Sequence, residues 1–155
     1  MTTHAKPAVD LASAGRPGYR AMSAFSRATH DLPLDPLIRE MIRVRASMLN
    51  GCAYCVDMHT KDARAKGETE QRLFAVAAWH EAPFFSPAER AALALTDALT
   101  LLAGNPLPDA VVAEAEQQLG VEGVAAATWI IVTINAWNRV AIASHLQAGD
   151  YEPDA

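Results

Sequence analysis

The feature that most constrains the fold of this chain is a series of helix start and stop signals between segments of helical apolar spacing. Asp35-Pro36 precedes apolar residues at positions 37, 41, 44 and 48, and Asn50-Gly51 follows them. Ser86-Pro87-Ala88-Glu89 has the pattern of a capping box with proline at the first helical position. No segment shows convincing alternation of period two, and alanine is abundant. These patterns predict an all-α fold.

The positions of the expected helices follow from these signals. A first helix over 17–30 is expected to be buried through Tyr19, Met22 and Phe25. Six further helical segments are predicted at 36–49, 52–66, 69–80, 86–103, 109–119 and 121–147, the last with a bend near Asn135. We expect residues 1–16 to form a poorly ordered or loosely docked arm, and residues 17–150 to form a single domain.

Composition and charge exclude several classes of function. The 155 residues carry a net charge of −5, with acids and bases interspersed and no basic stripe, so we expect no nucleic-acid partner. Residues 1–17 lack the apolar run of a secretory signal, and the longest apolar run, 123–134, is too short to span a bilayer. We therefore predict a cytoplasmic protein with no membrane partner. In that compartment a CxxC pair is more often catalytic or metal-binding than structural.

The strongest chemical signal is Cys52-Ala53-Tyr54-Cys55 followed by His59, which contains both cysteines of the chain. Two cysteines three residues apart on a helix can form and break a disulfide with little backbone movement. His59 lies four residues after Cys55, on the same helix face, where it can exchange protons with a thiol. A helix start near Cys52 also favours a thiolate there. The pattern predicts thiol redox chemistry.

Glu40 is a candidate proton-transfer partner for His59. On one straight helix it would lie roughly 18 Å from Cys52, too far to cooperate. If the chain reverses at Asn50-Gly51, however, Glu40 lies within about one helical turn of His59, and a carboxylate–imidazole pair of this kind moves protons. The alternative is a solvated Glu40 paired with Arg39 or Arg43.

These residues also carry a family resemblance. The chain resembles the alkylhydroperoxidase D (AhpD)-like branch of the carboxymuconolactone decarboxylase superfamily, through Glu40, R-x-R-A-S-x-L-N-G-C-A-Y-C-x-D-M-H-T-K-D-A-R over 43–64, G-E-T-E-Q-R-L over 67–73 and I-N-A-W-N-R-V-A-I over 134–142. The resemblance implies an AhpD-like bundle of about six to seven helices that assembles as a homo-oligomer, commonly a trimer or hexamer. It implies reduction of hydroperoxides through a redox-active Cys52–Cys55 disulfide with no other cofactor, and a proton relay of His59 and Glu40.

The roles of the two thiols stay open at this point. Cys55, nearest to His59, is expected to attack the hydroperoxide, and Cys52, nearer the helix start and expected to be more exposed, would resolve the product. The helix-start argument instead favours Cys52 as the more acidic thiol. The electron donor would be a lipoyl protein, a thioredoxin-like protein or a small thiol. Rival functions are a cofactor-free acid–base enzyme of the carboxymuconolactone decarboxylase type, and a non-enzymatic redox sensor that uses the CxxC as a switch.

Candidates for substrate binding are Trp137, Asn138 and Phe84. For Asn138, a polar residue in an apolar helix, hydrogen bonding at a subunit interface is the alternative. Zinc is a further alternative, with Cys52, Cys55 and His59 as ligands. Since no second Cys/His pair completes such a site, we expect no metal.

Two further expectations concern the remaining histidines and the last apolar segment. His4, His30 and His80 have no partner pattern and are expected to be surface or structural residues. The last segment carries more apolar residues than a chain of this size readily buries, which favours a subunit interface built on Trp129, Ile130, Ile131 and Ile134.

Overall fold

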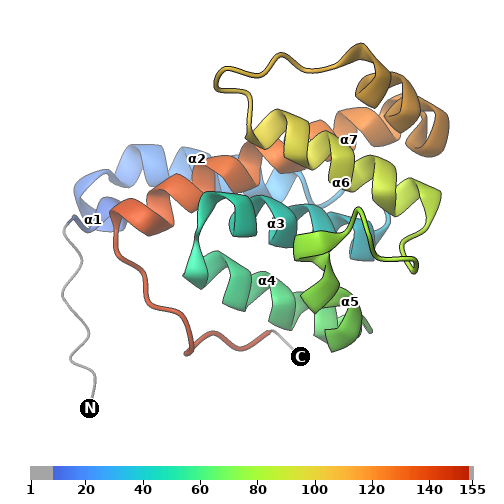
Figure 1. The fold of residues 1–155 in the computed structure, drawn as a ribbon. Helices are drawn as coiled ribbons and strands as arrows, with labels where there is room; N and C mark the ends of the chain where they lie inside the picture. Colours follow the sequence, from blue (N-terminus) through green and yellow to red (C-terminus); the bar gives the residue numbers. More distant parts are fainter. Residues whose placement is uncertain (1–8, 154–155) are drawn as a thin grey trace.

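The computed structural model describes residues 9–153, and within that range it contains helices and no strand (Figure 1). The all-α prediction is confirmed. Residues 1–8 of the predicted N-terminal arm lie outside the described residues. The helices are α1 (Leu11–Ala14), α2 (Arg16–Ala28), α3 (Pro36–Asn50), α4 (Ala53–Ala65), α5 (Glu70–Ala75), the 3₁₀ helix η1 (Val76–Ala78), α6 (Pro87–Thr100) and α7 (Asp109–Ala143).

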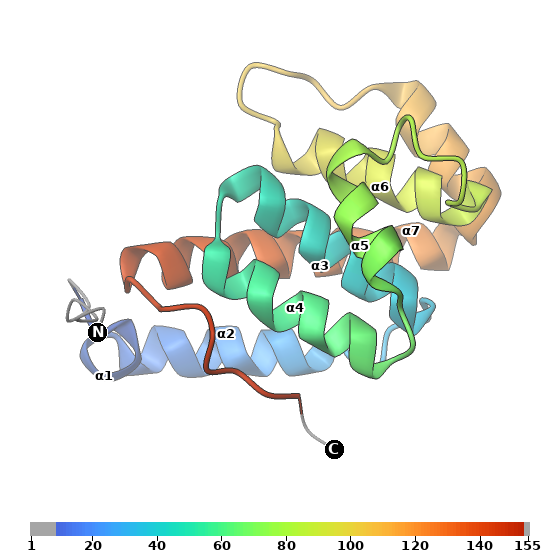
Figure 2. The same ribbon diagram turned by 60° about the horizontal axis from the view of Figure 1, so that its bottom comes forward.

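Helix α3 is the central element and packs against α4, α6 and α7 (Figure 2). Its start is fixed by Asp35, whose Oδ1 accepts hydrogen bonds from the backbone N–H groups of Leu37 and Ile38 at 2.8 and 3.2 Å. Its end is fixed by Gly51, which adopts the left-handed conformation at φ 68° that glycine enters without strain. Because the chain reverses there, α4 returns alongside α3.

The apolar core lies on both sides of α3. One cluster joins α3 to α6 and α7, and a second joins α3 to α5, η1 and α6. A third, smaller cluster surrounds the two cysteines with Ala46 of α3 and with Ile134 and Ala141 of α7. Each fully buried aliphatic side chain contributes about 1.5–3 kcal/mol relative to exposure. The CxxC segment is therefore held against a well-packed scaffold.

Helix α7 is interrupted at one place, Gly120, which has φ 71° and ψ 166°. The predicted boundary between the segments 109–119 and 121–147 is confirmed at this glycine. The bend expected near Asn135 is wrong, and the helix ends at Ala143. Asn135 lies within the regular helix, and its side-chain amide donates to the carbonyl of Ile131 at 2.9 Å and to Thr100 Oγ1 at 3.0 Å.

Three other sequence expectations need correction. The segment 69–80 forms two elements, α5 and the short η1, rather than one helix. Helix α6 ends at Thr100 rather than at 103. Helix α2 forms as predicted, but none of its residues is buried, and Tyr19 is 39% exposed. The reason is that α2 packs along one side of α7 instead of entering the core.

The exposed apolar surface of α7 is smaller than the sequence predicts. Ile130, Ile131 and Ile134 are buried against the rest of the chain, because α3 and α6 cover that face. Trp129 is 52% exposed, and Val121 and Val132 are exposed as well. Helix α7 is long and apolar enough to cross a membrane, judged by length and composition alone. The core helix of a soluble protein meets the same two criteria.

Candidate active site

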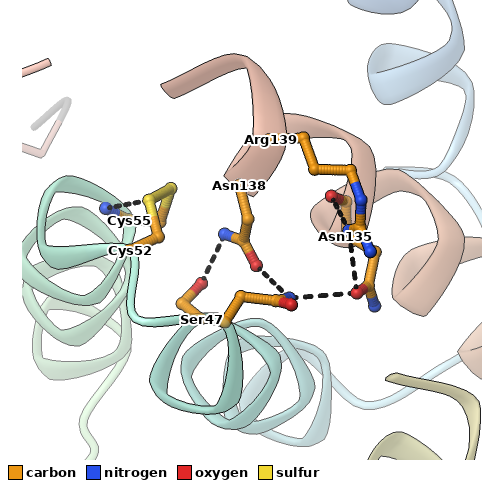
Figure 3. Close-up of a disulfide and its surroundings, with 7 residues drawn as sticks. Ser47, Cys52, Cys55, Asn135, Asn138 and Arg139 are labelled. Carbon is orange, nitrogen blue, oxygen red and sulfur yellow. Dashed lines mark hydrogen bonds between the residues drawn. A yellow bond between two sulfur atoms is a disulfide. The ribbon is translucent and has the colours of Figure 1, made fainter. Parts of the chain in front are cut away.

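The two cysteines lie at the start of α4. Cys52 is the N-cap residue, and its Sγ accepts a hydrogen bond from the backbone N–H of Cys55 at 3.3 Å (Figure 3). The two sulfur atoms lie 2.24 Å apart and form a disulfide across a Cα–Cα distance of 5.4 Å. Each cysteine is only 2% exposed, so the expectation that Cys52 is the more exposed of the two is wrong. Ala46, Ile134 and Ala141 pack around both residues.

Glu40 and His59 are in direct contact, as a chain reversal at Gly51 predicts. The Nδ1 atom of His59 lies 3.1 Å from Oε2 of Glu40, and the two residues are 7% and 1% exposed. Oε1 of the same carboxylate lies 2.9 Å from an Arg43 guanidinium nitrogen and 3.2 Å from Nζ of Lys66. The alternative of a solvated Glu40 is excluded, although its contact with Arg43 is real.

Glu40 remains ionised despite its burial. Burial disfavours the charge and raises the pKa of this carboxyl. The hydrogen bond with His59 and the positive charges of Arg43 and Lys66 together outweigh burial, so the pKa lies below its usual value. A carboxylate facing Nδ1 favours the imidazole form that carries its proton on that nitrogen, which leaves Nε2 as the base.

A second carboxylate, which the sequence reasoning missed, approaches the same imidazole. Oδ2 of Asp62 lies 3.6 Å from His59 Nδ1, and the other oxygen, Oδ1, accepts a 2.7 Å hydrogen bond from the hydroxyl of Tyr151. The signal in the sequence was the spacing of three residues between His59 and Asp62, which places both on one helix face. The contact with Tyr151, 89 residues away, has no local signal.

Ligand atoms of Glu40, His59 and Asp62 lie within 4.8 Å of one another, a grouping able to hold a metal ion. It differs from the zinc set considered above, whose two sulfur atoms are bonded to each other. Arg43 and Lys66 already provide positive charge to Glu40. The cluster is thus balanced by the protein's own cations, and the expectation of no metal stays a prediction.

Cys55 and His59 line the same cavity, of about 320 Å³. Trp137, a predicted substrate-binding residue, forms part of its wall and meets Tyr19 of α2 edge to face, with ring centroids 5.3 Å apart. His30, expected to have no site role, also lines the cavity, because the end of α2 reaches the same opening. The surface that the wall presents to the cavity is mostly apolar. The remaining lining residues are Ser26, Arg43, Tyr54, Met58, Asp62, Thr133, Ile134, Ala141 and Leu146.

Cys52 faces a different depression, an open groove on the outer surface of α3 and α4. Its other lining residues are Ser47, Met48, Gly51, Ala53, Val56, Asp57 and Thr60. The two halves of the disulfide therefore border two separate openings. The opening at Cys55 is the more enclosed and is lined by His59, whereas the opening at Cys52 is shallower and has no histidine in its lining.

Asn138 and Phe84 do not line the cavity. Asn138 is fully buried; its amide nitrogen donates to Ser47 Oγ at 3.0 Å, and its oxygen accepts from Asn50 at 2.9 Å (Figure 3). These bonds join α7 to α3 within one chain, so the alternative of a subunit-interface role is not needed to satisfy the side chain. Phe84 lies in the loop before α6, against Phe85.

Comparisons with known proteins show the family to which the chain belongs. The model of the carboxymuconolactone decarboxylase family matches residues 17–98. YdfG, an uncharacterized protein of Bacillus subtilis (strain 168), is 40% identical over 126 residues, which cover 81% of this chain and 86% of YdfG.

Two solved structures share the fold. One is a protein of unknown function from Agrobacterium tumefaciens, described as a candidate antioxidant defence protein AhpD. Its TM-score is 0.89 at 32% identity, and the match covers 94% of this chain and 100% of the Agrobacterium chain. An uncharacterized peroxidase-related protein from Ralstonia eutropha JMP134, described as an AhpD core, has a TM-score of 0.78 at 27% identity, covering 93% and 77%. The chain therefore belongs to the carboxymuconolactone decarboxylase family, in its AhpD-like branch.

Proposed function

We propose that this protein is a thiol-dependent peroxidase that reduces hydroperoxides through Cys52 and Cys55. The observation that carries the proposal is that His59, which is in contact with buried Glu40, lines the same cavity as Cys55. A cysteine and an imidazole on one cavity, with a carboxylate in contact with the imidazole, are the components of an activated thiol nucleophile.

The proposed reaction begins with the reduced dithiol. His59 takes the proton of the Cys55 thiol, and the thiolate attacks the terminal oxygen of the hydroperoxide, which breaks the O–O bond. The alkoxide takes a proton from His59 and leaves as an alcohol, while Cys55 becomes a sulfenic acid. Cys52 then attacks the Cys55 sulfur, which releases water and forms the disulfide. The two electrons come from the dithiol, and an external thiol reductant restores it.

The two openings support the assignment of Cys55 as the peroxidatic thiol. Cys55 borders the cavity that contains His59, whereas Cys52 borders the outer groove, where an external thiol would attack the disulfide. The position of Cys52 at the N-cap of α4 is the argument for the opposite order, because the helix start favours a thiolate there.

The largely apolar wall of the cavity suits an organic hydroperoxide better than hydrogen peroxide. The groove at Cys52 is open, as a lipoyl arm, a thioredoxin-like protein or a small thiol would require. No cofactor beyond the Cys52–Cys55 disulfide is needed for this cycle.

The test is to count free thiols in the purified, reduced protein before and after a stoichiometric pulse of cumene hydroperoxide. The expected result is fast loss of two thiols per chain, strongly slowed in His59→Ala. Thiols that react no faster than free cysteine would contradict the proposal.

Two rival functions give different results. An acid–base enzyme of the decarboxylase type would keep full activity on a carboxylated lactone in the double variant C52S/C55S. A redox sensor would change its partner or assembly on oxidation, with negligible turnover.

We further propose that the protein acts in the cytoplasm as a homo-oligomer, a trimer or hexamer. The support is the exposed apolar stripe of α7 formed by Val121, Trp129 and Val132, since a second copy would remove it from water. Light scattering at micromolar concentration is expected to give a multiple of the chain mass; a monomer mass would contradict the assembly.

A further inference from the structure

The chain that follows α7 returns across the molecule and lies along α4 (Figures 1 and 2). We call residues 145–153 the C-terminal strap. Nζ of Lys61 donates hydrogen bonds to the carbonyls of Gly149 and Tyr151 at 3.0 and 2.8 Å. The N–H of Gly149 donates to Oδ2 of Asp57 at 3.1 Å. The strap is therefore bound to the helix that carries Cys55 and His59.

The strap also reaches the site itself. Its Tyr151 hydroxyl donates to Oδ1 of Asp62 at 2.7 Å, and Oδ2 of Asp62 lies 3.6 Å from His59 Nδ1. Leu146, near the beginning of the strap, lines the cavity that contains His59. A continuous series of contacts thus runs from the strap through Asp62 to the imidazole.

The charge on Asp62 is maintained by the same contacts. Burial raises the pKa of this carboxyl, but the nearby His59 imidazole, the hydrogen bond from Tyr151 and the charge of Lys66 together outweigh burial, so its pKa lies below the usual value. The groups that face the imidazole or its carboxylates are Glu40 and Arg43 of α3, Asp62 of α4, Lys66 after α4, and Tyr151 of the strap.

We propose that Asp62 and Tyr151 are positioning residues for His59, and that the docked strap holds Asp62 near Nδ1 so that the proton stays on Nδ1 and Nε2 is kept as the base. The consequence for catalysis rests on the peroxidase function proposed above; the effect on the imidazole does not.

Two carboxylates on one nitrogen constrain the ring more than one. Glu40 approaches Nδ1 from α3, and Asp62 approaches it from the following turn of α4. With both in place, rotation or tautomer exchange of the ring loses two favourable contacts rather than one. Loosening of the strap would release Asp62 from Tyr151 and leave Glu40 as the remaining constraint.

The proposal is tested by long-range proton–nitrogen NMR of the histidine rings in ¹⁵N-labelled protein, which reports the nitrogen that carries the proton. His59 is identified by the loss of its signals in His59→Gln. The variants are Asp62→Asn and Tyr151→Phe, each made in the natural chain and in Glu40→Gln, where Asp62 is the remaining carboxylate at Nδ1. Glu114→Gln, an exposed carboxylate of α7 bonded to Gln118, is the matched control.

In the Glu40→Gln chain we expect the ratio of the Nδ1–H to the Nε2–H tautomer to fall about tenfold in Asp62→Asn and about threefold in Tyr151→Phe. Glu114→Gln should leave the ratio unchanged. In the natural chain the rate of hydroperoxide-driven thiol loss should fall in the same order.

Unchanged ratios in both variants would overturn the proposal, and so would an effect of Asp62→Asn without one of Tyr151→Phe, since the strap would then not act through Asp62. If Asp62→Asn fails to fold by circular dichroism, the conservative Tyr151→Phe decides alone. A wild-type protein without peroxidase activity that still shows the tautomer effect would contradict the proposed function and leave this inference standing.

Discussion

The two halves of the disulfide are chemically alike but border different regions of the molecule. On one side, Cys55 shares a partly enclosed, largely apolar cavity with His59, whose imidazole contacts buried Glu40. On the other side, Cys52 borders an open groove between the surfaces of α3 and α4. Both cysteines are equally buried, so exposure does not distinguish them.

This difference teaches that the proposed roles of the two thiols depend on the surroundings of each sulfur rather than on its accessibility. Proton transfer needs a group that can accept and release a proton, and the cavity contains the His59 imidazole. Disulfide exchange needs room for a second thiol to approach, which the groove offers. The predictions below test this division, beginning with the largest expected effect.

The first prediction concerns the order of the thiols. In C55S we expect complete loss of hydroperoxide-driven oxidation, because the thiol on the cavity is gone. In C52S the first step should remain and sulfenic acid should accumulate at Cys55. Dimedone labelling with mass spectrometry assigns the modified residue. Sulfenic acid at Cys52 in C55S, with none at Cys55 in C52S, would reverse the division.

The second prediction concerns the base on the cavity side. His59→Ala should slow thiol oxidation by about 10²–10⁴-fold, the range of a general acid–base group. It should leave reduction of the preformed disulfide by dithiothreitol within a few-fold of the natural rate, because that attack uses the groove. Stopped-flow measurement of the two half-reactions separates these effects. Equal slowing of both would mean that the two openings share one proton relay.

The third prediction concerns Glu40 and stability. Glu40→Gln leaves Arg43 and Lys66 beside a neutral amide and should lower the free energy of unfolding by about 2 kcal/mol at pH 7, discounted for the partial exposure of both cations. Because the folded-state pKa of Glu40 is lowered, its ionisation contributes stability that is fully present above its usual pKa of 4.5 and is lost as pH falls through the folded value.

The difference between Glu40→Gln and the natural protein should therefore shrink with falling pH in this acid range. Urea unfolding at pH 7 and at several values below 4.5 measures it. A difference independent of pH would mean that Glu40 acts through shape rather than charge.

The fourth prediction compares two variants, one at each opening, that should each alter a different half-reaction. Ala53 is exposed in the groove, so Ala53→Trp should slow reduction by a bulky dithiol protein about tenfold and leave hydroperoxide attack unchanged. Trp137→Ala should instead weaken the use of cumene hydroperoxide about tenfold relative to hydrogen peroxide, because an aromatic wall of the cavity is lost. Kinetics with both oxidants and both reductants check this. A variant that alters both half-reactions equally would argue against separate sites.

Local signals in the sequence predicted most of the fold correctly. Asp35, Gly51 and Ser86 act over three or four residues, so their capping roles are readable without knowledge of the fold, and each is found in place. Asn135 shows the limit of such reasoning: the sequence suggested a bend, but the residue lies in a regular part of α7, with its side chain bonded to Ile131 and Thr100. The burial of Ile130 and Ile131 likewise depends on which helices cover α7.

The candidate site divides in the same way. By itself the sequence determined the CxxC pair, the position of His59 on the same helix face, and the reversal at Gly51 that brings Glu40 to His59, because each depends on spacing along one helix or across one turn. Only the tertiary structure decided that Cys55 and Cys52 border different openings. It also decided that His30 and Trp137 line the cavity, whereas Asn138 joins α7 to α3. The contact between Tyr151 and Asp62 likewise depends on the tertiary structure. These contacts join residues tens of positions apart, and their geometry is set by the packing of α2, α4, α7 and the strap, which no local pattern encodes.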